Sequence, residues 1–143
     1  MTVREALLKH HRLYDFGPTP GGYEDKWARV GFGPFTIRFP NFKARADALR
    51  FHDIHHILTG YPPVQWRGEM ELAYFEFGTG FGKFWAGRLF DSLALILAFI
   101  WPVKAWRAFR RGCNAKQSLF RDYEYNEELL DKSVGELREE LGI

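Results

Sequence analysis

The sequence HDIHH, residues 52 to 56, contains three of the five histidines of a 143-residue chain, with an aspartate among them. His52 and His56 are four positions apart and would lie on one face of a helix, and Asp53 is three positions before His56. Two imidazoles in this spacing can bind one cation, as they do in helical zinc motifs. Nitrogen and oxygen ligands without sulfur suit zinc, iron, cobalt or manganese, so the cluster indicates a candidate site for a divalent metal.

A complete metal site needs a further ligand from another segment. Glu69 lies beyond a short loop, at the start of the next expected helix, and is the first candidate. Glu71 and Glu76 are alternatives, and Glu76 shares a helix face with Glu69. His55 is a further ligand, a hydrogen-bond donor to a ligand, or a solvated neighbour. The spacing alone leaves a purely structural role for these histidines as open as metal binding.

Two classes of metalloenzyme with related motifs are excluded. Membrane di-iron desaturases need more histidines than this chain has and several long apolar spans, whereas the apolar run from Ser92 to Val103 is shorter than the roughly 20 residues of a span. The helical zinc proteases carry a glutamate as general base directly after the first histidine. Here that position is Asp53, so protease chemistry of this kind is not expected.

The elements that must position these residues are mostly helical. We expect a mainly α fold, a single helical domain over residues 1–143, with a loop-rich N-terminal third that holds a short strand or hairpin at FTIRF. Asn41 is a good N-cap for a helix over residues 42–58. Further helices are expected over residues 2–13, 68–77 and 84–109, the last as one or two helices kinked or divided near Pro102, and in part of 118–131. Ser133 and Glu136 form a capping box for a final helix, and residues 17–22, GPTPGG, interrupt regular structure.

The composition excludes some partners. The net charge is +2, with 20 basic and 18 acidic residues, which gives no argument for nucleic acid binding. Cys113 is the single cysteine, so the chain has no internal disulfide and no cysteine-rich zinc site. These features are compatible with a reducing compartment.

The segment from Phe81 to Phe109 combines large apolar and basic side chains. The apolar side chains line a tunnel for a long apolar tail or belong to an ordinary core. The basic side chains follow at spacings of three and four, which would place them on one helix face. A basic face beside an apolar helix suits a bilayer surface or a lipid phosphate, and a solvated helix face is the alternative. The residues in question are Phe84, Leu93, Leu97, Trp101, Lys104, Arg107 and Arg111.

The string HDIHHILTGYPPVQWRGE resembles the signature of the coenzyme Q biosynthesis protein 4 family, in which HDxxH is followed by a Leu-x-Gly-x-Pro turn and Gly-Glu. The later RRGCNAKQSLF and LREELGI segments resemble the family too, so that the likeness covers residues 42–143. This chain has twelve residues between His56 and Glu69, one more than the family usually has. The chain is therefore identified as a divergent, bacterial-type homologue.

The resemblance implies a helical fold and a divalent metal, zinc, iron or another, bound by His52, Asp53, His56 and Glu69, which would also be the catalytic residues. It implies action on a polyprenylated aromatic ring in ubiquinone synthesis, by oxidative decarboxylation that replaces the carboxylate at ring carbon 1 with a hydroxyl. The protein would be cytoplasmic and peripheral at the inner cell membrane. The seven apolar and basic residues above would bind the isoprenoid lipid.

The resemblance leaves two other functions open. One is a non-catalytic scaffold that binds isoprenoid lipids at a membrane surface and organises other quinone-biosynthesis proteins. The other is a divergent relative acting on another lipid or aromatic acid, for which the unusual N-terminal third and the longer loop argue. A homo-oligomer is compatible with each of these functions.

Overall fold

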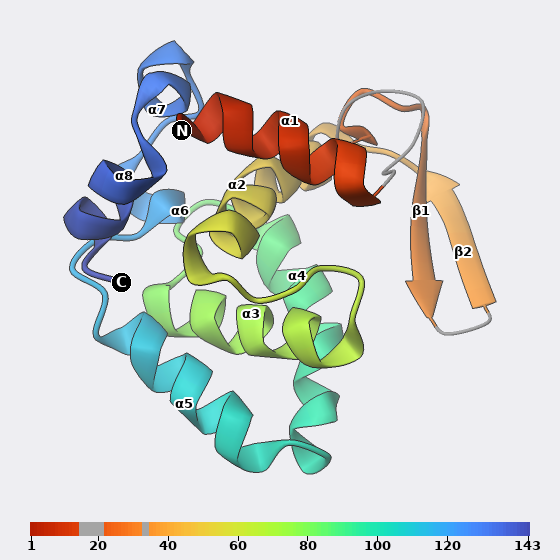
Figure 1. Ribbon diagram of the computed structural model, residues 1–143. Coiled ribbons are helices and arrows are strands. Elements are labelled where there is room, and N and C mark those ends of the chain that lie inside the picture. Colours follow the sequence, from red (N-terminus) through yellow and green to blue (C-terminus); the bar gives the residue numbers. More distant parts are fainter. Residues whose placement is uncertain (15–21, 33–34) are drawn as a thin grey trace.

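The computed structural model describes residues 1–14, 22–32 and 35–143, which are mainly helical with one short hairpin (Figure 1). Strands β1 (Trp27–Phe32) and β2 (Phe35–Pro40) pair antiparallel, with Trp27 opposite Pro40. The expected strand at FTIRF is therefore the second strand of a hairpin. The break expected over residues 17–22 lies almost wholly outside the described residues. The mainly α fold with a hairpin in the N-terminal third is confirmed.

Helix α2 (Lys43–Thr59) runs through the middle of the molecule, between α1 (Val3–Tyr14) and α3 (Trp66–Thr79) (Figure 1). Its buried side chains pack against those of two short C-terminal helices, α6 (Leu119–Asp122) and α8 (Val134–Leu141). The fully buried members of this core include Phe51, Ile54, Leu58, Leu119, Phe120, Leu137 and Leu141. The helix that bears the histidines is thus fixed by packing along its length.

Asn41 is not the N-cap of α2, which corrects the expectation from sequence. The cap position is Phe42, and no side chain caps this helix. The Asn41 amide instead donates to three backbone carbonyls of the segment before β1, those of Gly22, Tyr23 and Asp25. Three tertiary hydrogen bonds replace one local cap, and they fix the N-terminal third against the start of α2.

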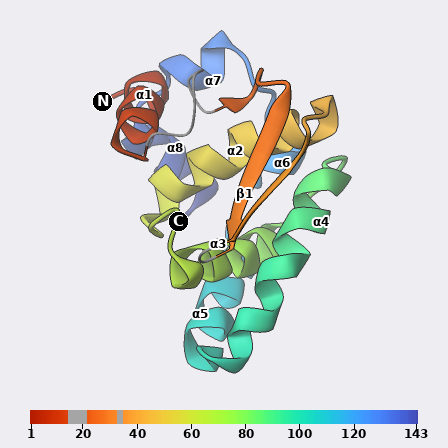
Figure 2. The same cartoon turned by 90° about the vertical axis from the view of Figure 1, so that its right-hand side faces the viewer.

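The apolar segment after α3 forms helix α4 (Trp85–Ala94), the 3₁₀ turn η2 (Leu95–Phe99) and helix α5 (Pro102–Cys113), so the division near Pro102 is confirmed. In both views α5 and the chain before it lie at the lower end of the molecule, and α3 separates α5 from α2 (Figures 1 and 2). Two glycines allow α3 and α5 to pack closely. A Cβ on Gly112 would lie 2.1 Å from the Phe75 carbonyl oxygen, and one on Gly78 would lie 2.4 Å from that of Phe109.

The C-terminal part contains α7 (Glu127–Asp131) as well as α6 and α8. The expected capping box is present at the start of α8, where Ser133 Oγ accepts from the Glu136 amide at 3.1 Å and the Glu136 carboxylate accepts from the Ser133 amide at 3.0 Å. Among the described residues, no helix is both long enough and apolar enough to cross a bilayer.

Candidate metal centre

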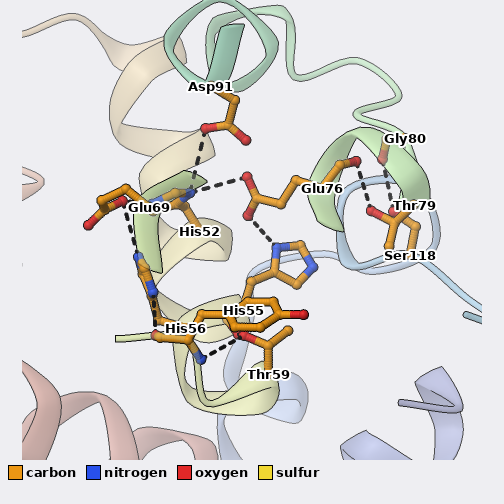
Figure 3. Close-up of polar contacts among 11 residues, drawn as sticks. His52, His55, His56, Thr59, Glu69, Glu76, Thr79, Gly80, Asp91 and Ser118 are labelled. Carbon is orange, nitrogen blue, oxygen red and sulfur yellow. Dashed lines mark hydrogen bonds and ion pairs between the residues drawn. The ribbon is translucent and has the colours of Figure 1, made fainter. Parts of the chain in front are cut away.

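Three of the four residues predicted to bind a metal come together between α2 and α3. The Nε2 atoms of His52 and His56 each lie 3.4 Å from Oε2 of Glu69 (Figure 3). All three atoms lie within 4.8 Å of one another. Metal–ligand bonds of about 2.0–2.2 Å in a tetrahedral site separate neighbouring ligand atoms by roughly 3.4 Å. The three groups are therefore spaced as ligands of one ion would be.

The second nitrogen of each imidazole is held by an acceptor. His52 Nδ1 lies 3.1 Å from the Glu76 carboxylate, and His56 Nδ1 lies 2.8 Å from the carbonyl oxygen of Tyr61. With a proton on Nδ1 donated to such an acceptor, Nε2 is the nitrogen that faces Glu69 and that a metal would bind in place of a proton. Both rings are thus oriented with the ligand nitrogen toward Glu69.

Glu76 is the buried centre of this hydrogen-bond network. Its other carboxylate oxygen lies 2.6 Å from Nδ1 of His55, and its side chain is fully buried. His55 is therefore a hydrogen-bond partner of Glu76, which was one of the alternatives that the sequence left open. Burial alone would raise the pKa of Glu76, but His52, Asp91 and His55 together outweigh it and hold that pKa well below its ordinary value.

The Glu69 carboxylate is stabilised in its charged form. Burial opposes ionisation, but the hydrogen bonds and the charge interactions with His52 and His56 together outweigh it and lower the pKa of Glu69 below its ordinary value. An ionised carboxylate beside two imidazole nitrogens is the donor set that zinc or iron favours.

Asp53 lies apart from these three groups. Its Oδ2 accepts from the Tyr23 hydroxyl at 2.5 Å and lies 3.1 Å from His11 Nε2. Asp53 thus connects α2 to the N-terminal third, and its role as a metal ligand stays a prediction. Reasoning from sequence missed Tyr23 and His11, because no local pattern relates positions 11 and 23 to position 53.

The loop between α2 and α3 holds both ligand-bearing helices. Its Val64 amide donates to Oε1 of Glu69 at 2.7 Å, which turns Oε2 toward the histidines. Val64 has a φ of 64°, the one positive value among the described non-glycine residues. A Cβ on Gly68 would lie 1.9 Å from the Pro62 carbonyl oxygen, so this loop packs directly on the start of α3.

The residues predicted to bind a lipid do not share one surface. Phe84 packs on the core against Phe51 and Phe120, and Leu97 and Trp101 are half-buried. Leu93, Lys104 and Arg107 are exposed. The Arg111 guanidinium donates to the Thr59 carbonyl at 3.0 Å and lies over the Tyr61 ring. Arg111 thus fixes the loop before Glu69, and lipid binding by these residues stays a prediction.

Exposed apolar side chains on α4, η2 and α5 form a surface that we call the apolar ridge. The sequence pattern alone did not distinguish these exposed residues from core residues. The members of the ridge are each more than half exposed, and Phe99 is 90% exposed. Within each of these three elements they recur at spacings of three or four, which is the pattern that could have indicated an exposed apolar side of each element. The ridge comprises Trp85, Leu89, Leu93, Ile96, Phe99, Ile100, Val103 and Trp106.

Comparison with known proteins finds relatives of a single kind. The chain is 33% identical over 157 residues to "Ubiquinone biosynthesis protein COQ4, mitochondrial" of Ajellomyces capsulatus, covering 99% of this chain and 54% of the relative. It is 36% identical over 154 residues to the protein of that name in Sclerotinia sclerotiorum, covering 100% and 53%. The match to the Podospora anserina protein is 37% identical over 95 residues, covering 64% and 30%.

The chain therefore spans about half the length, or less, of the curated relatives that it matches. No family model matches it, and no solved structure matches it significantly.

Proposed function

The chain is a homologue of the COQ4 family of ubiquinone biosynthesis proteins over nearly its whole length, and from this premise we propose that it acts in ubiquinone biosynthesis through a metal centre. His52, His56 and Glu69 would bind one divalent cation. The substrate would be a polyprenylated aromatic ring whose carboxylate at carbon 1 is replaced by a hydroxyl. The convergence of two Nε2 atoms on one Glu69 oxygen supports this proposal most directly.

The residues present fit such an ion in number, chemistry and spacing. A divalent ion bound there supplies a Lewis acid for the ring carboxylate and, if it is redox-active, electrons for dioxygen. Glu76 and the Tyr61 carbonyl keep the two imidazoles in the orientation that binding needs. The Glu69 side chain is 35% exposed whereas that of His56 is 2% exposed, so the substrate would approach from the side of Glu69.

The overall reaction breaks the bond between the ring and its carboxylate and forms a carbon–oxygen bond. Carbon dioxide leaves, dioxygen is the oxidant, its second oxygen atom ends as water, and an external donor supplies the remaining electrons. The described residues bind, orient and shield the reacting group, and none of them is itself oxidised or reduced in this scheme.

A quinone-deficient strain tests the proposal. The strain lacks this gene, and its lipid extract is measured by mass spectrometry after expression of the wild-type chain or a variant. We expect His56→Ala to leave a carboxylated ring intermediate accumulating, while Glu71→Gln, on the same helix as Glu69, restores the quinone. Restoration of quinone by His56→Ala would refute the metal-dependent reaction.

The apolar ridge favours a second, non-exclusive candidate function, binding at a membrane surface as a scaffold for isoprenoid intermediates and other quinone-biosynthesis proteins. An apolar surface of this length is unusual on a protein without a partner. Exposed Lys104, Arg107 and Arg110 lie on the same helix as its last residues, which suits the cytoplasmic face of an anionic inner membrane. A purely scaffolding protein would still restore quinone synthesis after His52→Ala, and this outcome separates the two functions.

A further inference from the structure

The other nitrogen of His52 faces a second group of possible ligands. His52 Nδ1 lies 3.1 Å from Oε2 of Glu76 and 3.8 Å from Oδ1 of Asp91 (Figure 3). One ligand atom from each residue lies within 4.8 Å of the other two. The residues come from three helices, α2, α3 and α4, so the packing of the fold assembles this group. These separations are close to those of neighbouring ligand atoms around one ion.

Both carboxylates of this group are removed from solvent. The Glu76 side chain is fully buried and that of Asp91 is 8% exposed. Oδ2 of Asp91 is buried and has no hydrogen-bond partner among the described residues, and Figure 3 shows the Asp91 carboxylate facing that of Glu76. A buried carboxylate oxygen without a donor is costly, and a second carboxylate beside it adds repulsion. Both carboxylates are therefore stable as anions only where a cation lies beside them, and without one burial and the neighbouring Glu76 raise the pKa of Asp91 well above its ordinary value.

When all three of its carboxylates are ionised, a single metal ion does not neutralise the cluster. Glu69, Glu76 and Asp91 together carry three negative charges when ionised, while neutral imidazoles carry none. One divalent cation at Glu69 leaves a net negative charge, which lies in the buried part between Glu76 and Asp91. A second cation there would be held by two carboxylate oxygens and one imidazole nitrogen.

We propose that His52, Glu76 and Asp91 bind a second divalent cation, so that the centre is binuclear with His52 between the two ions. This inference rests on the proposed function, because the first ion is the one at His52, His56 and Glu69. Oxygen-rich ligation with one imidazole suits manganese, iron or zinc. The proton on His52 Nδ1 leaves to solvent when the second ion binds, and His55 continues to hold Glu76 through its other oxygen.

Metal stoichiometry tests the second site. The full chain is stripped with a chelator, titrated with Zn²⁺ or Mn²⁺, and analysed for bound metal, with circular dichroism as a check of folding. We expect two equivalents for the wild type, one for Asp91→Asn, and two for the control Glu71→Gln. The Mn²⁺-loaded wild type should show a spin-coupled electron paramagnetic resonance spectrum, which Asp91→Asn loses.

The outcomes separate the two proposals. One equivalent in the wild type, lost in Glu69→Gln and unchanged in Asp91→Asn, would overturn the second site and leave the proposed function standing. Two equivalents in a folded Asp91→Asn variant would also overturn it. No bound metal in the wild type would remove both. If Asp91→Asn does not fold, the stoichiometry and the spectrum of the wild type decide alone.

Discussion

At the scale of single residues, the two histidines of the centre are held by acceptors of different strength. His56 Nδ1 faces a neutral backbone carbonyl, whereas His52 Nδ1 faces the ionised carboxylate of Glu76. Hydrogen bonds to a charged acceptor are roughly twice as strong as neutral ones. The orientation of His52 should therefore depend strongly on the charge of Glu76.

Replacing Glu76 by Gln tests that dependence. The amide keeps the shape of the side chain but removes its charge, and we expect metal affinity at the first site to fall about 10- to 100-fold, the usual effect of losing such a partner. Competition with a chromophoric chelator measures this change. Glu71→Gln is the matched control on α3, and equal affinities in the two variants would contradict a positioning role for Glu76.

The sequence predicted part of this site and missed its supporting groups. The spacing of His52 and His56 and the short loop before Glu69 are local features, so the meeting of these three residues could be foreseen. The bond between Glu76 and His55 depends on how α2 and α3 are rotated against each other, and Asp91 comes from a third helix. Such relations are set by tertiary packing, which periodicity within one helix does not specify.

At the scale of elements, the loop between α2 and α3 sets the position of Glu69. Val64→Pro removes the backbone N–H that donates a hydrogen bond to Glu69, and a proline at this position cannot adopt a φ of 64°. We therefore expect a strong loss of metal binding. Val64→Gly keeps the amide and removes strain on the order of 1 kcal/mol, so it should bind metal like the wild type. Titration of both folded variants measures this. Similar metal loss in the two would show that the amide is unimportant.

The capping box of α8 gives a prediction that is independent of the metal. Ser133→Ala should lower the free energy of unfolding by about 1 kcal/mol, measured by urea denaturation at neutral pH. Hydrogen bonds from Ser133 lower the pKa of Glu136, so this stabilisation is present above the ordinary value of 4.5 and is lost as the pH falls below it. The Ser133 amide still donates to Glu136 in Ser133→Ala, so the pH-dependent part is tested by Glu136→Gln, whose difference from the wild type should shrink in acid. A constant difference for Glu136→Gln would contradict the capping box.

The elements differ in how far the sequence determined them. The capping box, the division at Pro102 and the hairpin follow from local chemistry and are confirmed. The prediction of Asn41 as an N-cap was wrong, because the Asn41 side-chain amide instead donates hydrogen bonds to three backbone carbonyls that are distant in sequence. A residue with several possible partners cannot be assigned from its neighbours in sequence alone.

At the scale of the whole molecule, the proposed metal centre and the apolar ridge lie in different parts of the fold. The ridge residues lie on α4, η2 and α5, whereas the proposed metal centre lies between α2 and α3. Asp91 of α4 belongs to both regions, because it faces His52 from a helix whose outer side carries ridge residues.

Vesicle binding tests the ridge. Phe99 is almost fully exposed, so Phe99→Asp should leave the melting temperature unchanged while it weakens binding to anionic vesicles severalfold, because a charge replaces an apolar anchor. Co-sedimentation at two salt concentrations measures both the apolar and the electrostatic part. Leu13→Asp, an exposed apolar position on α1, is the control, and equal binding by the two variants would argue against the ridge.

The central claim, that two imidazoles and one carboxylate bind a single ion, is tested most directly by anomalous diffraction from crystals of the metal-loaded chain, recorded at the absorption edge of the metal. We expect an anomalous peak about 2.0–2.2 Å from Nε2 of His52, Nε2 of His56 and Oε2 of Glu69. Well-ordered crystals of the loaded chain without a peak at these three atoms would contradict it.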